Sequence, residues 1–146
     1  MVKRGDPPLL ALMTVAVDAI ERRHLELMAE SGFDDVRRAH NSVLANLPAA
    51  GMRLTELAHS AGITKQAMAE LVEDLQEKGY VEKVPDPSDG RAKLIVWAER
   101  GMRAHERTVE IFEAIDADIS PVLDEGGVAG LKLQIAAAID ALPAGG

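Results

Sequence analysis

Residues 54–75 read LTELAHSAGITKQAMAELVEDL and carry the strongest structural pattern of this chain. Thr55 is placed to cap a short helix, and Gly62 provides the break that ends it. Thr64 is placed to cap a second, longer helix, and the small Ala58 leaves room for the two helices to cross. One face of the second helix is apolar, because four residues recur at helical spacing: Met68, Leu71, Val72 and Leu75. The stretch predicts a helix–turn–helix.

The segment that follows, starting at Gly79, reads GYVEKVPDPSDGRAKL and predicts a short β-hairpin. Residues 80–84 and 92–97 have the composition of strands, and Asp89-Gly90 is typical of a hairpin tip. The prolines between the strands are expected to stop them from pairing within the loop, because proline lacks the N–H that a ladder needs. The hairpin is therefore expected to form a short exposed wing after the helix–turn–helix.

The outward face of the second helix carries opposite charge at its two ends. Residues 53–66 have a net charge of +1, whereas residues 67–78 have a net charge of −3. If this helix binds DNA, the duplex must therefore meet its N-terminal end, where free N–H groups and the positive pole of the helix dipole favour phosphate. Arg91 at the hairpin tip is expected to enter a minor groove, with Asp89 orienting its guanidinium by a hydrogen bond. The candidate DNA-binding residues are Arg53, Thr64, Lys65, Gln66, Ala69, Asp89, Arg91 and Lys93.

The remaining sequence predicts helices on both sides of this region. Apolar residues recur at helical spacing before and after it, including a helix predicted over residues 34–47. The first helix is apolar over most of its circumference, which in a chain of this size indicates contact with a partner subunit. We expect a single domain over residues 1–146, in which 53–97 binds DNA, with helices in 7–47 before this region and in 98–142 after it.

Composition limits the possible functions. The chain has 146 residues, of which 47% are hydrophobic and 27% are charged, the balance of a globular protein. It contains no cysteine, which excludes disulfides and thiolate metal sites. The net charge of −8 argues against nonspecific coating of nucleic acid but leaves room for a small basic surface. Residues 101–146, with a net charge of −5, are not expected to face phosphate.

Together these motifs resemble the MarR family of winged helix–turn–helix regulators. The resemblance is carried by LTELA at 54–58, GIT at 62–64, LVEDL at 71–75, GYV at 79–81 and DPSDGRAKL at 86–94. It implies a mainly α fold with a small β-hairpin wing, flanked by N- and C-terminal dimerisation helices. It also implies a homodimer, usually a repressor, that binds double-stranded operator DNA and responds to a small-molecule effector, in relatives a small aromatic acid. A cytoplasmic location is expected because the N-terminal residues lack the small-x-small cleavage pattern of a signal peptide. By this resemblance the candidate effector-binding residues are Arg22, Arg37 and His40.

Other functions have less support in the sequence. No nucleophile motif or phosphate-binding loop is present, and paired carboxylates such as Asp34-Asp35 and Glu73-Asp74 are interpreted as solvated, so we do not expect an enzyme. The four histidines lack local ligand spacing, so neither a metal nor another cofactor is expected. The apolar stretch at residues 9–17 is shorter than the ~20 residues that span a bilayer. One alternative stays open: a winged-helix protein-interaction module that does not bind DNA, suggested by the acidic residues in 67–78.

Overall fold

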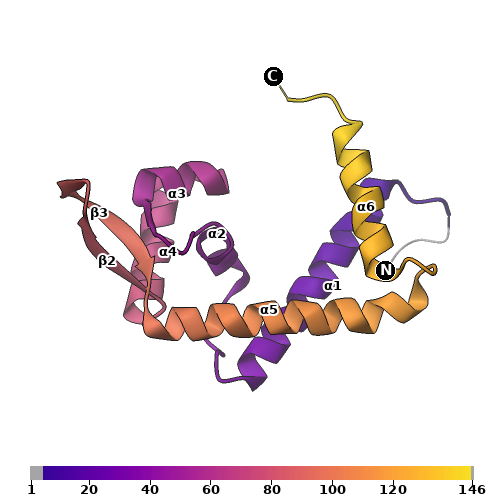
Figure 1. Cartoon of the computed structure of the whole chain (residues 1–146), viewed down its shortest axis with the longest axis horizontal. Helices are drawn as coiled ribbons and strands as arrows, with labels where there is room; N and C mark the ends of the chain where they lie inside the picture. The colour runs from indigo at the N-terminus through magenta and orange to yellow at the C-terminus, as the bar shows by residue number, and fades with distance from the viewer. Residues whose placement is uncertain (1–4, 146) are drawn as a thin grey trace. The chain divides into compact units, whose positions relative to one another are not determined.

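The computed structural model describes residues 5–145, which form two compact units divided after Val109. The first unit (Figure 1) contains α1 (Leu9–Glu30), η1 (Arg38–His40), α2 (Asn41–Leu44), β1 (Met52–Arg53), α3 (Leu54–Ala61), α4 (Lys65–Glu77), β2 (Val81–Asp86), β3 (Asp89–Trp97) and the first part of α5 (Glu99–Ile119). The second unit contains the rest of α5, η2 (Ser120–Val122) and α6 (Gly127–Asp140). The predicted fold class, mainly α with a small β wing in a winged helix–turn–helix, is confirmed.

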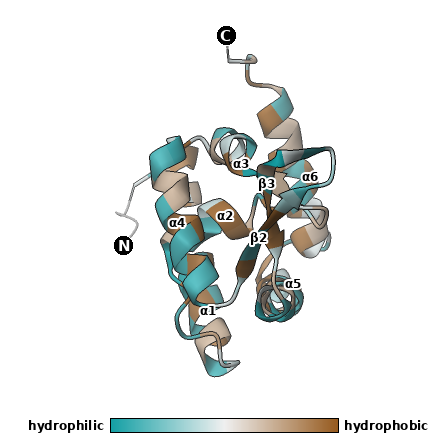
Figure 2. Cartoon of the chain, turned by 90° about the vertical axis from the view of Figure 1, so that its left-hand side faces the viewer, coloured by the Kyte–Doolittle hydropathy of each residue, from teal (hydrophilic) through white to brown (hydrophobic). Residues whose placement is uncertain are grey.

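The predicted helix–turn–helix is present as α3 and α4. Gly62 ends α3 in the left-handed conformation (φ 67°), and the Ile63 N–H donates to the Ala58 carbonyl at 3.1 Å. Thr64 caps α4, because its Oγ1 accepts from the Ala67 N–H at 3.1 Å. Brown and teal residues alternate along α4 in Figure 2, as expected of a helix with one buried and one exposed face. The buried residues of α4 are Met68, Val72 and Leu75.

The start of α3 differs from the prediction. The helix begins at Leu54, so Thr55 is not its cap; the N-cap is Arg53, which makes no capping side-chain bond. Arg53 is extended (φ −70°, ψ 149°) because it pairs with Leu94 in the sheet, and the helix starts directly after this pairing. At two residues, β1 is too short to leave a recognisable periodicity in the sequence.

The sheet has the strand order β1-β3-β2, and both strand pairs are antiparallel. The hairpin strands are longer than predicted, since they pair as far as Asp86 opposite Asp89. The expectation that the prolines would keep this region unpaired was wrong, because Pro85 lies opposite Lys93 within the ladder. β2 is an edge strand, where a residue without an N–H is tolerated, and the register shifts directly after Pro85.

The helix predicted over residues 34–47 is broken, and only η1 and the one-turn α2 form there. Arg37 is extended (φ −113°, ψ 160°), and its N–H donates to His40 Nδ1 at 2.9 Å instead of entering a helix. Asp35 is also held outside a helix, because its carboxylate accepts a hydrogen bond from the Tyr80 hydroxyl. Side-chain hydrogen bonds therefore replace the helical backbone bonds that the periodicity predicts.

Large apolar side chains are exposed on the first and last helices, each taken within its own unit. On α1 they are Leu9, Leu10, Leu12, Met13, Val15 and Val17. On α6 they are Leu131, Leu133, Ile135 and Ile139, followed by Leu142 just after the helix. Exposed apolar residues that are grouped in this way are typical of protein–protein contact surfaces.

Candidate nucleic-acid interface

The first turn of α4 is an open surface that carries positive charge. Lys65 and Gln66 are exposed, and within residues 5–145 neither side chain makes a hydrogen bond or an ion pair. Thr64 is also exposed, although its hydroxyl oxygen is used in the cap, and the small Ala69 is half-buried one turn further on. The first N–H groups of a helix have no carbonyl within the helix to bond, and the dipole is positive at this end. This turn is therefore suited to hold an anion such as a DNA phosphate.

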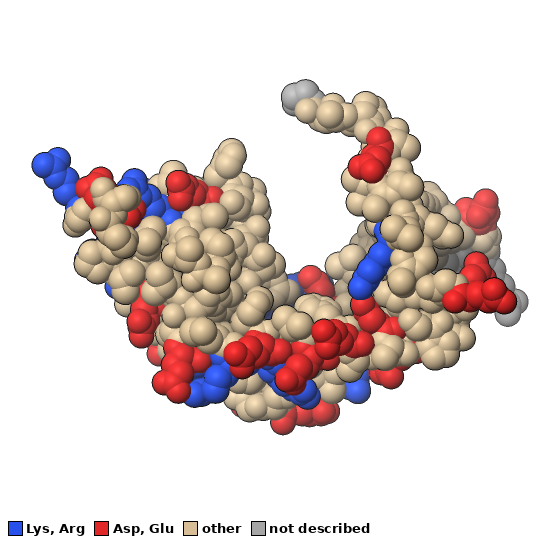
Figure 3. Space-filling view, viewed as in Figure 1, with Lys and Arg blue, Asp and Glu red and all other residues tan. Residues whose placement is uncertain are grey.

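The wing, meaning β2, β3 and the turn between them, carries the second group of candidates. Arg91 and Lys93 are exposed on β3, and Figure 3 shows basic atoms that project beyond the end of the hairpin. Asp89 Oδ1 accepts from the backbone N–H of Arg91 at 3.1 Å. Asp89 thus shapes the turn, because an Asp side chain readily bonds the N–H two residues ahead. The sequence predicts that Asp89 holds the Arg91 guanidinium, whereas the bond in the described residues goes to the Arg91 backbone.

Asp86 joins the wing turn to β1. One carboxylate oxygen, Oδ2, accepts from Arg53 Nε at 2.8 Å and from Arg53 Nη2 at 2.7 Å. The other, Oδ1, accepts from the Ser88 N–H at 2.8 Å and from the Ser88 hydroxyl at 2.7 Å. The hydrogen bonds from Ser88, and after them those from Arg53, lower the pKa of Asp86 to about 2. This buried carboxylate stays ionised and fixes the turn that carries Arg91.

Arg53 differs from the other DNA-binding candidates because its guanidinium is committed to Asp86. We interpret Arg53 as a residue that positions the wing, with its remaining exposed edge free to approach a phosphate. Sequence reasoning missed Asp86. The available signal was the Asp-Pro-Ser order of residues 86–88, in which an Asp side chain is placed to bond the residue two positions ahead.

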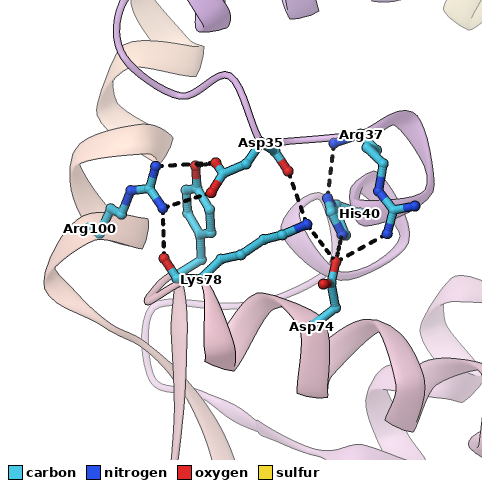
Figure 4. A network of polar contacts seen from close by, with 7 residues as sticks. Asp35, Arg37, His40, Asp74, Lys78 and Arg100 are labelled. Atoms are coloured by element: carbon cyan, nitrogen blue, oxygen red, sulfur yellow. Dashed lines mark hydrogen bonds and ion pairs between the residues drawn. The ribbon is translucent and has the colours of Figure 1, made fainter.

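Two of the three effector candidates meet at Asp74 on α4 (Figure 4). Asp74 Oδ2 accepts from His40 Nε2 at 2.6 Å, from Lys78 Nζ at 2.8 Å and from Arg37 Nη2 at 3.2 Å. His40 is fully buried, and both of its ring nitrogens are bonded, since Nδ1 accepts the Arg37 N–H. Arg22 lies elsewhere, exposed on α1. The three candidates therefore do not form one site, and His40 is a hydrogen-bonded core histidine.

A second polar cluster continues from Lys78 toward α5 (Figure 4). The Asp35 carboxylate accepts from the Tyr80 hydroxyl at 2.5 Å and from Arg100 Nη1 at 3.0 Å, and Arg100 Nη1 also donates to the Lys78 carbonyl at 2.7 Å. Burial opposes ionisation of Asp35, but the hydrogen bonds from Tyr80 and Arg100 prevail and lower its pKa. Asp35 and Asp74, interpreted from sequence as solvated, instead hold the C-terminal end of α4 against its neighbours.

The burial of His40 predicts a pH-dependent stability. Burial lowers the pKa of His40 below its ordinary 6.5, although the hydrogen bond to Asp74 opposes this. The folded protein therefore holds His40 neutral, and the associated stability is present above pH 6.5 and is lost as the pH falls through the lowered pKa. We expect His40→Gln to show a smaller decrease in the free energy of unfolding between pH 7.5 and 5 than the wild type, measured by urea denaturation. His59→Gln, at an exposed position, is the control, and equal pH slopes in wild type and His40→Gln would contradict the assignment.

No helix in residues 5–145 is both long and apolar enough to cross a membrane. In the same residues, no three His, Asp or Glu side chains gather in a way that could hold a metal ion.

A family model described as MarR family matches residues 34–92. No curated protein matches the chain. The reduced form of MarR from E. coli superposes with a TM-score of 0.77 at 22% identity, covering 96% of this chain and 100% of that one. A mutant E. coli MarR complexed with operator DNA gives a TM-score of 0.70 at 22% identity, covering 93% and 94%. The transcriptional repressor CouR bound to a 23-mer DNA duplex gives 0.69 at 21%, covering 91% and 92%.

Proposed function

We propose that the protein is a sequence-specific, DNA-binding transcriptional regulator of the MarR type, because a MarR family model matches its winged helix–turn–helix over residues 34–92. The observation that carries the proposal is the pair of exposed basic elements in the first unit, the first turn of α4 and the wing. Lys65 and Gln66 are placed to reach base edges in a major groove, and Ala69 lets the backbone approach a thymine methyl. Arg91 is placed to enter the neighbouring minor groove, where the potential is most negative.

We further propose that the protein binds a pseudo-palindromic operator as a homodimer. The exposed apolar residues of α1 and α6 supply surface for a second copy, in keeping with dimerisation through 7–47 and 98–142. Two copies would present two recognition helices to successive major grooves, with residues 53–97 of each copy reading one half-site. Several similar proteins were solved on DNA, and one of them is named a repressor, which favours repression here.

We propose that a small molecule modulates operator affinity by favouring one spacing of the two recognition helices over another. The protein would act in the cytoplasm on double-stranded DNA, with no catalytic activity, no cofactor and no membrane partner. Arg22, Arg37 and His40 are weaker effector-site candidates than the sequence suggests, because Arg37 and His40 bond to Asp74 and Arg22 bonds to Asp18.

The wing arginine provides the direct test of DNA binding. Arg91→Ala is expected to weaken binding to DNA from upstream of the protein's own gene by ~1–3 kcal/mol, the cost of one good groove contact. Fluorescence anisotropy at two salt concentrations measures the affinity. Arg23→Ala removes the same charge from an exposed position on α1 and should bind as the wild type does. Equal affinities for wild type and Arg91→Ala would refute the role of the wing.

The same titration decides between this function and a protein-interaction module without DNA binding. The net charge of −8 and the −3 carried by residues 67–78 favour that second function. Binding that prefers the upstream duplex over an unrelated one of equal length supports the regulator. A failure to bind either duplex at low salt supports the interaction module, because electrostatic attraction to DNA is strongest there.

A further inference from the structure

Two neighbouring cavities in the first unit share a wall made by Trp97 and His105. The outer cavity has a volume of about 220 Å³, and the inner one about 30 Å³. Trp97 ends β3 and His105 lies on α5, and the centroids of their rings are 5.2 Å apart with the ring planes inclined by 39°. The His105 side chain is exposed, so the wall between the two cavities lies at the surface of the unit.

The lining of these cavities determines what charge they can accept. Among the described residues, neither cavity is lined by lysine or arginine. The outer cavity has apolar walls, including Leu47 and Met102, and one carboxylate, that of Glu106. The inner cavity adds polar groups from Asn41, Thr108 and His24, and burial lowers the pKa of His24, which favours its neutral form. An anionic ligand would lose its hydration without gaining a fixed cationic partner and would lie close to Glu106, so both effects oppose its binding.

We propose that these cavities bind a small planar aromatic cation. Trp97 and Glu106 both line the outer cavity, and an indole π face and a carboxylate each attract positive charge. The apolar walls would cover the rings of the ligand. Cavities for drug-sized ligands measure roughly 300–1,000 Å³, so the smaller volume here limits the ligand to one or two fused rings. This ligand differs in charge from the aromatic acids that the sequence resemblance implies.

The position of the cavities gives such a ligand a route to the wing. Trp97 and Val96 belong to β3, the strand that also carries Arg91, whereas His105 and Glu106 belong to α5. A ligand held between the two elements would favour one arrangement of the wing strand against α5. As an effector site this rests on the proposed function, whereas the binding of the ligand does not.

Calorimetric titration in the absence of DNA tests the charge preference. The probes are 1-methylquinolinium, quinoline and 2-naphthoate, which are two-ring compounds that are positive, neutral and negative near pH 7.5. We expect 1-methylquinolinium to bind at least ~10-fold more tightly than 2-naphthoate, with quinoline between them. Glu106→Gln should reduce this preference severalfold. Glu113→Gln removes the same charge from an exposed position farther along α5 and should leave the preference unchanged.

A second variant tests the indole separately. Trp97→Phe keeps an apolar aromatic wall but offers a weaker π face, so it should weaken the binding of 1-methylquinolinium more than that of quinoline. Equal weakening of both, 2-naphthoate binding as tight as the cation, an unchanged preference in Glu106→Gln, or no binding of any probe would each overturn the proposal. Failure of the proposed function would give a different result, because the ligand-free protein would then not bind its upstream DNA.

Discussion

Replacing Gly101 with alanine is expected to destabilise the protein by at least ~3 kcal/mol, the upper end of the usual cost of overpacking. A Cβ at this position would lie 1.9 Å from the Tyr80 carbonyl oxygen and 3.0 Å from Trp97 Cε3. The Tyr80 backbone has little freedom to move, because its carbonyl accepts from the Ala98 N–H at 3.0 Å and its N–H donates to the Leu75 carbonyl at 2.9 Å. The added methyl group would therefore force α5 away from the end of α4 and the base of the wing.

Urea denaturation measures this effect, and fluorescence reports it locally because Trp97 is the single tryptophan of the chain. Gly130→Ala on α6 is the matched control, since a Cβ at that position meets no atom within 4 Å. It should leave the free energy of unfolding unchanged or raise it slightly, because alanine favours helix more than glycine does. A Gly101→Ala protein that unfolds at the same urea concentration as the wild type would show that α5 does not approach Tyr80 this closely.

The parts of the fold that sequence predicted well are those determined by neighbouring residues. Thr64 and the Ala67 N–H that it caps are three positions apart, and Gly62 stands at the turn whose left-handed conformation it adopts. The apolar spacing of α4 likewise reports on a single face of a single helix. In each case the pattern and its structural cause lie within one or two helical turns.

The predictions that failed depend on partners distant in the chain. The helix predicted over residues 34–47 is broken partly because Asp35 bonds to Tyr80 and Arg100, which lie 45 and 65 positions away. Pro85 is tolerated within the ladder because β2 is the edge strand, and sequence alone does not give strand order.

The candidate site also combines features that neighbouring residues determine with features that depend on distant ones. The exposed N-terminal turn of α4 follows from local charge and from the apolar face on the opposite side. The bond between Arg53 and Asp86, 33 positions later, does not follow from the local sequence. The shared wall of the two cavities combines the end of β3 with α5, so neither segment indicates a binding site by itself. A basic residue identified in the sequence can therefore be proposed to contact DNA only once its bonding partners within the fold are known.

Replacing an exposed leucine on either outer helix with glutamate is expected to separate the proposed dimer. Leu10 on α1 is 77% exposed and Leu133 on α6 is 74% exposed, so within a single chain neither contributes much to the core. In a dimer each would be buried, and a carboxylate there would lose hydration without gaining a partner. Because symmetry introduces the substitution twice, we expect the dimer dissociation constant to rise at least ~100-fold.

Operator affinity should fall together with dimerisation, because a single copy reads only one half-site. Analytical ultracentrifugation across a concentration series measures the association, and anisotropy with the upstream duplex measures DNA binding. Gln134→Glu introduces the same charge at the next position of α6 without removing an apolar side chain, so it should disturb association much less than Leu133→Glu. Thermal unfolding of the two Leu→Glu variants at low protein concentration should match that of the dissociated wild type. If both variants remain dimeric, the apolar faces of α1 and α6 are not the interface and the two recognition helices must be paired in another way.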